Sequence, residues 1–178
     1  QEVESVPYYC PPEDSPEIKY IKARRSQLGG SVPARQENNE SLKFPALSVF
    51  EAQLKGSGDR SISTTMSFVR LLSTLAKNKE IGDRIVPIVP DEARTFGMEG
   101  MFRQLGIYSS VGQLYEPEDS DEISAYHESK DGQVLEEGIN EAGAFSAWIA
   151  TATSQSSHQY SLIPFYVFYS MFGFQRIG

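Results

Sequence analysis

The sequence predicts an α/β domain in which helices flank a mostly parallel β-sheet. Two short segments, Arg84–Pro90 and Leu162–Tyr169, are almost wholly apolar, as are strands that are covered on both faces of a sheet. Longer segments with apolar residues at helical spacing alternate with them along the chain. This alternation is typical of helices that pack on a parallel sheet.

Three helices are expected beside these strands. The first begins at Ser63 or Thr64, which are good capping residues, and the second is expected over Asp91–Leu105 with Gly106 as its stop. The third covers Asn140–Thr153 and is rich in alanine. The apolar face of the first helix consists of Phe68, Val69, Leu72, Leu75 and Ala76.

The first predicted strand contains Pro87 and ends at Pro90. Because proline lacks the backbone N–H group, the two prolines predict an edge strand or a strand end. Residues 109–132 are acidic and rich in turn-forming residues. They predict an exposed loop between the second and third helices.

Residues 1–60 are expected to form a connector and residues 61–178 a partial α/β domain. Three prolines, Pro7, Pro11 and Pro12, interrupt any early helix. Ser15–Glu17 resembles a helix start, and that helix should stop at Gly29–Gly30. A short amphipathic turn follows, with Leu47, Phe50 and Leu54 on one face. Since the sequence predicts only two or three strands, the sheet is expected to be incomplete.

The composition excludes several classes of protein. A net charge of −8, from 24 acidic and 16 basic residues, argues against a nucleic-acid partner, which demands a basic surface. No apolar run is long enough to predict a membrane helix, and the first residues do not resemble a secretory signal. With Cys10 as the only cysteine, no intrachain disulfide can form, and a reducing cytoplasm is the simplest compartment. Only His127 and His158 could serve a histidine metal centre.

Three segments carry a resemblance to a known family. They read DEARTFGMEG at Asp91–Gly100, EGINEAG at Glu137–Gly143, and FYVFYSMFGFQRIG at Phe165–Gly178. In this order and spacing they resemble the middle domain of the homodimeric bacterial type of pyruvate dehydrogenase, the thiamin-diphosphate-dependent first component of its complex. Tyr8–Glu17 and Pro33–Gln36 are similar to the connector before that domain.

The resemblance implies a partial transketolase-like domain that grips the aminopyrimidine of thiamin diphosphate. The family decarboxylates pyruvate and passes the two-carbon unit to a lipoyl group on dihydrolipoyl acetyltransferase. The implied cofactors are thiamin diphosphate and Mg²⁺, with the metal ligands outside this chain, and the implied partner is a second copy of the subunit. In the family, the two cofactor-binding domains of one site come from different subunits.

The resemblance makes Glu141 the pivotal residue. In thiamin enzymes a glutamate bonds the pyrimidine nitrogen opposite the amino group and favours the tautomer that can take a proton from the thiazolium carbon. Burial would raise the proton affinity of such a carboxylate. The residue also fits a purely structural reading, because acids are common in the first turn of a helix.

The carboxylates Asp91 and Glu92 follow the first predicted strand, where ligands collect in α/β folds. By resemblance they lie near the thiazolium and the substrate, with Glu92 the stronger candidate for a catalytic group. Asp91 could equally cap a helix. A glycosidase pair is disfavoured, because adjacent residues at a helix start point in different directions.

The resemblance assigns the remaining site residues to the last segment and to the segment before Glu141. Phe172 would stack on the aminopyrimidine, while Ile139 and Met171 would line the same pocket. Tyr169 and Arg176 would contact the carboxylate of pyruvate or the reaction intermediate, for which the planar fork of arginine is suited. Without the resemblance, apolar residues just after a strand are more often plain core.

Several parts of a complete enzyme are missing from the sequence. No Gly-Asp-Gly segment with a following asparagine is present to hold metal and diphosphate, nor is a P-loop or dinucleotide motif. The family also implies that the loop from about Val111 to Tyr126 orders over the active site. Two interpretations therefore stay open, a fragment of the enzyme that is inactive by itself, and a non-catalytic binding module that retains the scaffold. Transketolase would share the glutamate but not the DEARTFG and MFGFQRIG segments.

Overall fold

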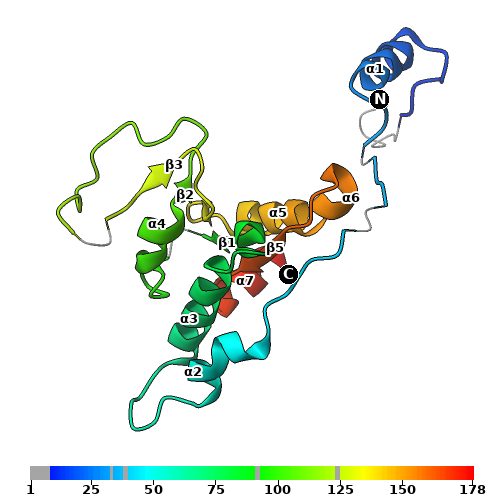
Figure 1. Cartoon of the computed structure of the whole chain (residues 1–178). Helices are drawn as coiled ribbons and strands as arrows, with labels where there is room; N and C mark the ends of the chain where they lie inside the picture. Colours follow the sequence, from blue (N-terminus) through cyan, green and yellow to red (C-terminus); the bar gives the residue numbers. More distant parts are fainter. Residues whose placement is uncertain (1–8, 33, 38–39, 91–92, 123–124) are drawn as a thin grey trace. The chain divides into compact units, whose positions relative to one another are not determined.

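The structure is a computed structural model that describes residues 9–32, 34–37, 40–90, 93–122 and 125–178 (Figure 1). The chain forms two compact units, Gln1–Gln36 and Glu37–Gly178. The predicted division at residue 60 into connector and domain stays a prediction.

The first unit contains one helix, α1 (Pro16–Gln27), as the sequence predicts. Ser15 caps it, because its hydroxyl accepts the Ile18 N–H at 3.4 Å, and Pro16 occupies the first helical position, where no N–H is needed. After Leu28 the chain reaches Gly29 and Gly30 at φ values of 91° and 103°, which only glycine adopts readily. No residue of α1 is buried.

The second unit is the α/β domain that the sequence predicts. Its helices are η2 (Leu47–Phe50), α2 (Glu51–Leu54), α3 (Thr64–Ala76), η3 (Gly82–Arg84), α4 (Glu99–Leu105), α5 (Glu141–Ala152), α6 (Ser154–His158) and α7 (Ser170–Ile177). Its strands are β1 (Ile85–Val89), β2 (Ile107–Tyr108), β3 (Glu128–Ser129), β4 (Leu135–Glu136) and β5 (Ile163–Tyr166). The main sheet is parallel with strand order β4-β1-β5, and β2 and β3 form a separate parallel pair.

Strand β1 is central in the main sheet, so the edge-strand alternative was wrong, whereas the strand does end at Val89, directly before Pro90. In a parallel strand the backbone groups of alternate residues point to opposite neighbours. The Ile88 carbonyl accepts from Val167 on the β5 side, and the Val89 carbonyl accepts from Glu137 on the β4 side. Pro87 therefore points toward β4, whose pairing with β1 begins only at Ile88. Its missing N–H costs no ladder bond.

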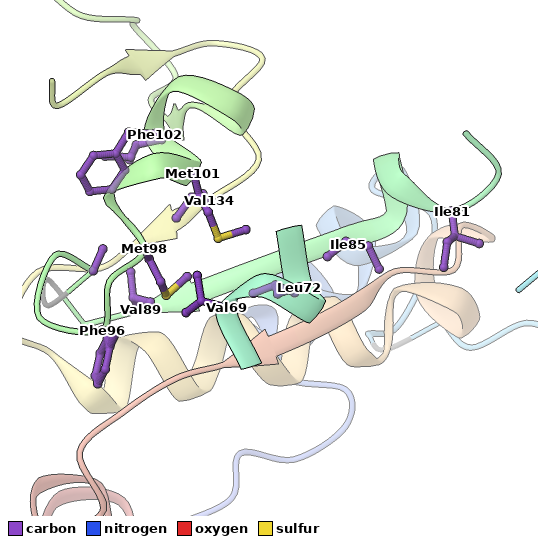
Figure 2. Packing of buried hydrophobic residues seen from close by; sticks show 12 residues of the cluster. Val69, Leu72, Ile81, Ile85, Val89, Phe96, Met98, Met101, Phe102 and Val134 are labelled. Atoms are coloured by element: carbon purple, nitrogen blue, oxygen red, sulfur yellow. The ribbon is translucent and has the colours of Figure 1, made fainter. Parts of the chain in front are cut away.

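The two faces of β1 are buried against different helices. Ile85 and Val89 belong to a cluster with Val69 and Leu72 of α3 and with apolar residues of the α4 region (Figure 2). Val86 and Ile88 pack on the opposite face with Ala144 of α5. All five residues of β1 are buried. This burial on both faces explains the continuous apolar sequence of the strand.

Two other expectations differ from the structure. The helix predicted over Asp91–Leu105 is shorter, because the described residues 93–97 form turns, with Gly97 at φ 72°, and α4 begins at Glu99. Strand β5 covers only Ile163–Tyr166 and is half-buried at the sheet edge. The segment after it forms the helix α7, which no sequence pattern predicted. The third predicted helix is confirmed as α5.

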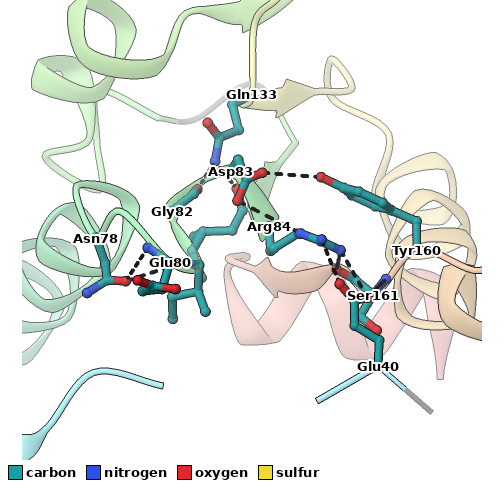
Figure 3. Close-up of polar contacts among 11 residues, drawn as sticks. Glu40, Asn78, Glu80, Gly82, Asp83, Arg84, Gln133, Tyr160 and Ser161 are labelled. Carbon is teal, nitrogen blue, oxygen red and sulfur yellow. Dashed lines mark hydrogen bonds and ion pairs between the residues drawn. The ribbon is translucent and has the colours of Figure 1, made fainter. Parts of the chain in front are cut away.

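A polar cluster joins residue 40 to the start of β1 and the approach to β5 (Figure 3). Arg84 donates from Nη2 to Glu40 Oε1 at 2.8 Å and from Nη1 to the Ser161 carbonyl at 3.1 Å. Its guanidinium lies 3.7 Å from the centroid of the Tyr160 ring. The Tyr160 hydroxyl in turn donates to Asp83 at 3.3 Å. The side chain of Arg84 is only 15% exposed, and its bonds hold Glu40 against the start of β1 and the approach to β5.

The Arg84–Glu40 pair is expected to stabilise the second unit. In a double-mutant cycle of Arg84→Met and Glu40→Gln, the coupling energy should exceed that of a more exposed pair, because the bond is charge-assisted and the two side chains are only 15% and 31% exposed. Urea denaturation measures it. The exposed pair Lys55–Glu51, with side chains 71% and 64% exposed, is the control and should couple by about 0.3–0.5 kcal/mol. Equal coupling in both cycles would contradict the role of the cluster.

Gly132 tests the packing between β2 and the turn before β4. An added Cβ would overlap the backbone of Ile107 and Tyr108. Gly132→Ala should therefore lower the free energy of unfolding by about 1–3 kcal/mol. Gly100→Ala, where no atom lies within 4 Å of the added Cβ, should instead be neutral or stabilising by up to about 1 kcal/mol in helix α4. Calorimetric melting of both variants decides the comparison.

Candidate functional site

The carboxyl ends of the three strands of the main sheet are followed by two predicted site residues, Glu141 and Tyr169, and by Thr95 and Phe96, which the sequence did not single out. Thr95 and Phe96 follow β1, Glu141 follows β4, and Tyr169 and α7 follow β5. The carboxyl ends of parallel strands lie at one edge of a sheet, where ligands bind in open α/β folds. Segments that are far apart in the sequence are brought together here by the strand order β4-β1-β5.

Glu141 is the first residue of α5 and is nearly buried, at 5% exposure. Asn140 caps the helix, because its side-chain oxygen accepts the Gly143 N–H at 3.0 Å. The chain enters this cap through Gly138, at φ 68°, a conformation that strains other residues. The positive end of the helix dipole favours the ionised carboxylate at this position.

Arg176 of α7 binds the Glu141 carboxylate directly. Nη1 of Arg176 donates to Oε1 at 2.6 Å and to Oε2 at 2.5 Å. The guanidinium lowers the pKa of the Glu141 carboxyl below its ordinary value, and its effect outweighs burial, which acts in the opposite direction. Burial thus acts on the proton affinity of Glu141 in the expected direction, but the net change is opposite, because a cation lies within bonding distance.

Aromatic rings connect this ion pair to the segment after β1. The guanidinium of Arg176 lies 5.0 Å from the Phe172 ring centroid. Tyr169 meets Phe172 edge-on at 6.3 Å and Phe96 at 4.9 Å between centroids. The Tyr169 hydroxyl donates to Thr95 Oγ1 at 2.7 Å. Four of the predicted residues, Glu141, Arg176, Phe172 and Tyr169, are thus joined in one continuous set of contacts.

Two other predicted residues, Ile139 and Met171, do not join this set. Ile139 and Met171 are 71% and 58% exposed, so neither lines a closed pocket. Asp91 and Glu92 lie outside the described residues. Thr95 was not singled out from the sequence, although it lies in the DEARTFG segment; only the tertiary contact with Tyr169 distinguishes it.

An open pocket of about 550 Å³ lies beside Tyr169. It is lined by residues after β1 and β5 and by the start of α3. They include Arg94, Thr95, Gly97, Phe168, Tyr169 and Ser170. The mixture of hydroxyl groups and aromatic rings suits a small polar ligand.

The acidic loop contacts the segment after β1 through Arg94. This arginine forms ion pairs with Asp119 and, at 3.6 Å, with Glu122. The Asp119 carboxylate also accepts the Tyr126 N–H at 3.2 and 3.1 Å. The described part of the predicted loop contains no helix or strand between β2 and β3. Its acids therefore contact the same edge of the sheet as the pocket.

Metal-binding groups and membrane-spanning helices can be assessed only for the residues whose placement is described. Among them, no group of three or more His, Cys, Asp or Glu side chains could hold a metal ion. The described helices also include none with the length and apolar character to cross a membrane.

The fold and these contacts define an α/β domain with its site at the carboxyl ends of a parallel sheet. Residues 42–178 match the family described as "Pyruvate dehydrogenase E1 component middle domain". The chain belongs to this family.

Curated relatives agree over nearly the whole chain. The chain is 64% identical over 177 residues to the "Pyruvate dehydrogenase E1 component" of Pseudomonas aeruginosa, and 58% and 53% identical over 178 residues to the proteins of that name from Cupriavidus necator and Escherichia coli K12. Each alignment covers 99% of this chain and 20% of the relative. The chain thus spans about a fifth of the length of the curated relatives it matches, and the resemblance found in the sequence is confirmed.

The Glu141–Arg176 pair predicts a dependence of stability on pH. Because the pKa of Glu141 is lower in the folded than in the unfolded chain, its charge stabilises the folded state above the unfolded value of about 4.3. This contribution is lost as the pH falls through the folded pKa. The free energy of unfolding of the original chain should therefore exceed that of Glu141→Gln at pH 7, and the difference should shrink in acid.

Urea denaturation between pH 7 and pH 3 checks this expectation. Glu17→Gln is the matched control, since Glu17 also lies in the first turn of a helix but is exposed. Its effect should be small at every pH. A difference for Glu141→Gln that does not change with pH would contradict the ion pair.

Proposed function

We propose that this chain supplies the pyrimidine-binding half of the active site of a pyruvate dehydrogenase first component. The complete enzyme would decarboxylate pyruvate and reductively acetylate a lipoyl group of dihydrolipoyl acetyltransferase, in the cytoplasm. The observation that carries the proposal is the nearly buried Glu141 carboxylate at the start of α5, with the Phe172 ring beside the same guanidinium that binds it. Family membership and the names of the relatives support it.

The residues present fit an aminopyrimidine. A carboxylate at a helix start can exchange a proton with a ring nitrogen, and an aromatic face can stack on a planar heterocycle. In this proposal Glu141 holds the proton at that nitrogen, Phe172 stacks on the ring, and Ile139 and Met171 close the pocket when partner segments cover them. When bound, thiamin diphosphate supplies the carbon nucleophile and the electron sink for decarboxylation.

Substrate would lie in the pocket beside Tyr169. The Tyr169 hydroxyl, held at 2.7 Å from Thr95, can contact the carboxylate or carbonyl of pyruvate, and Arg176 can add charge. Asp91 and Glu92, with Glu92 the stronger candidate, would act from the segment after β1. Mg²⁺ and diphosphate would be held by residues outside this chain, contributed across a dimer with a second subunit. Residues 61–178 would form the partial pyrimidine-binding domain in this arrangement.

A second function is favoured by one observation. The Glu141 carboxylate already has an internal partner in Arg176, as a structural ion pair in a non-catalytic binding module would. If the chain is part of an active pyruvate dehydrogenase, Glu141 takes part in turnover. If it is a non-catalytic binding module, Glu141 has no such role. A substitution at Glu141 therefore separates the two functions.

The decisive experiment replaces the matching segment of the Pseudomonas aeruginosa relative with this chain. The chimera should decarboxylate pyruvate in the presence of thiamin diphosphate and Mg²⁺, and Glu141→Gln should lower kcat by about 10²-fold or more, as loss of acid–base catalysis does. Glu51→Gln, at the exposed start of α2, is the control and should leave kcat unchanged. A folded chimera without turnover, or one indifferent to Glu141→Gln, would favour the binding module.

The isolated chain should have no turnover and no micromolar affinity for thiamin diphosphate, because it carries only one half of the proposed site. Calorimetric titration with thiamin diphosphate and Mg²⁺ measures this affinity. Clear binding that is lost in Glu141→Ala would mean that the chain builds a cofactor site alone, and the half-site proposal would need replacement.

A further inference from the structure

The two groups assigned to the aminopyrimidine share one partner in this structure, the side chain of Arg176. Its Nη1 lies 2.6 and 2.5 Å from the two carboxylate oxygens of Glu141. Its Cζ lies 5.0 Å from the centroid of the Phe172 ring. The carboxylate and the aromatic face are therefore both engaged by a single planar group.

A guanidinium and an aminopyrimidine can make similar contacts with a carboxylate and a neighbouring aromatic ring. Both are planar, both present an N–C–N edge, and each can meet a carboxylate through one nitrogen while its face lies near an aromatic ring. Arg176 makes this arrangement with Glu141 and Phe172. Nη1 of Arg176 contacts both carboxylate oxygens and the guanidinium lies over the Phe172 ring. A heterocycle that bonds to Glu141 from the same side and stacks on the same face of Phe172 therefore requires Arg176 to leave.

The exposure of the pair indicates which side chain moves. The Glu141 side chain is 6% exposed, whereas that of Arg176 is 46% exposed. Glu141 is held in the first turn of α5, while the arginine reaches it on a long stem from α7. A nearly buried carboxylate without a counter-ion is unfavourable, so Arg176 stabilises the site when no ligand is bound. A half-exposed guanidinium can return to water at low cost.

We propose that Arg176 occludes the site by occupying the place of the aminopyrimidine, and that it must withdraw before a planar nitrogen heterocycle binds. The inference rests on the proposed function and adds to it a residue that sets ligand affinity. A ligand displaces Arg176 only if it replaces the charge-assisted bond to Glu141. The site is therefore selective for heterocycles whose ring nitrogen shares a proton with a carboxylate.

Binding of the pyrimidine half of thiamin to the 178-residue chain tests the inference. The probe is 4-amino-5-hydroxymethyl-2-methylpyrimidine, titrated at millimolar concentration and followed by NMR shifts of the chain. If Arg176 leaves the site open in about a tenth of the molecules, Arg176→Gln should bind the probe about tenfold more tightly than the original chain. Arg103→Gln, an exposed arginine in the last turn of α4, is the control and should change nothing.

A second measurement follows the Glu141 carboxyl by ¹³C NMR without any ligand. Arg176→Gln should raise the pKa of Glu141, since the guanidinium is the main cause of its lowering. Among the described residues, Tyr166 is a second titratable group at Glu141: it donates to the backbone carbonyl of Glu141 at 3.4 Å and stays neutral in acid, since its own pKa is raised. An unchanged Glu141 pKa would mean that the pair does not form in solution and would overturn the inference, with the proposed function intact.

The binding outcomes separate the inference from the proposed function. Equal, weaker or absent probe binding in Arg176→Gln would overturn occlusion, because removal of the guanidinium would not have opened the site. Should that variant fail to fold, Arg176→Lys keeps the charge but lacks the planar group and should bind the probe more tightly than the original chain, by a smaller factor. Binding no tighter than the original would overturn the inference. Failure of the proposed function appears elsewhere, as a chimera whose turnover is indifferent to Glu141→Gln.

Discussion

Burial of β1 on both faces is the constraint on which the rest of the second unit depends. Ile85 and Val89 bind the strand to α3 and the α4 region, and Val86 and Ile88 bind it to α5. Each buried aliphatic side chain contributes about 1.5–3 kcal/mol by leaving water. Because β4 and β5 pair with this strand in parallel, its position also determines where the segments that follow all three strands meet.

The candidate site forms where the segments that follow β4, β1 and β5 come together. A parallel sheet places the ends of its strands at one edge, so a helix start after β4 and a helix after β5 come together although 35 residues separate the two members of the Glu141–Arg176 pair. The site combines a nearly buried carboxylate, aromatic rings and a half-exposed cation. The carboxylate is kept ionised by the cation rather than made more basic by burial, which gives the unliganded chain a satisfied ion pair in place of an isolated buried charge.

Much of the fold could be predicted from local patterns. Ser15 and Pro16 predict the start of α1, the spacing of Phe68, Val69 and Leu72 predicts α3, and Asn140 with the alanines after it predicts α5; all three are confirmed. The failures have identifiable causes. Pro87 indicated an edge strand because the sequence does not reveal that β4 pairs only from Ile88 onward. The strand predicted over Leu162–Tyr169 ends at Tyr166, because a short apolar run does not reveal where its pairing stops, and no sequence pattern predicted the helix α7 after it.

The sequence by itself determined the α/β class, the burial of β1, the family to which the chain belongs and the residues that could form a site. Capping, periodicity and motif spacing are local properties, and each is decided by residues within one turn or one strand. Only the tertiary structure decided that Arg176 binds Glu141, that Thr95 binds Tyr169 and that Arg94 binds the acidic loop. The physical reason is that these partners are 25 to 74 residues apart, so their contact depends on strand order and helix packing, which no local pattern specifies.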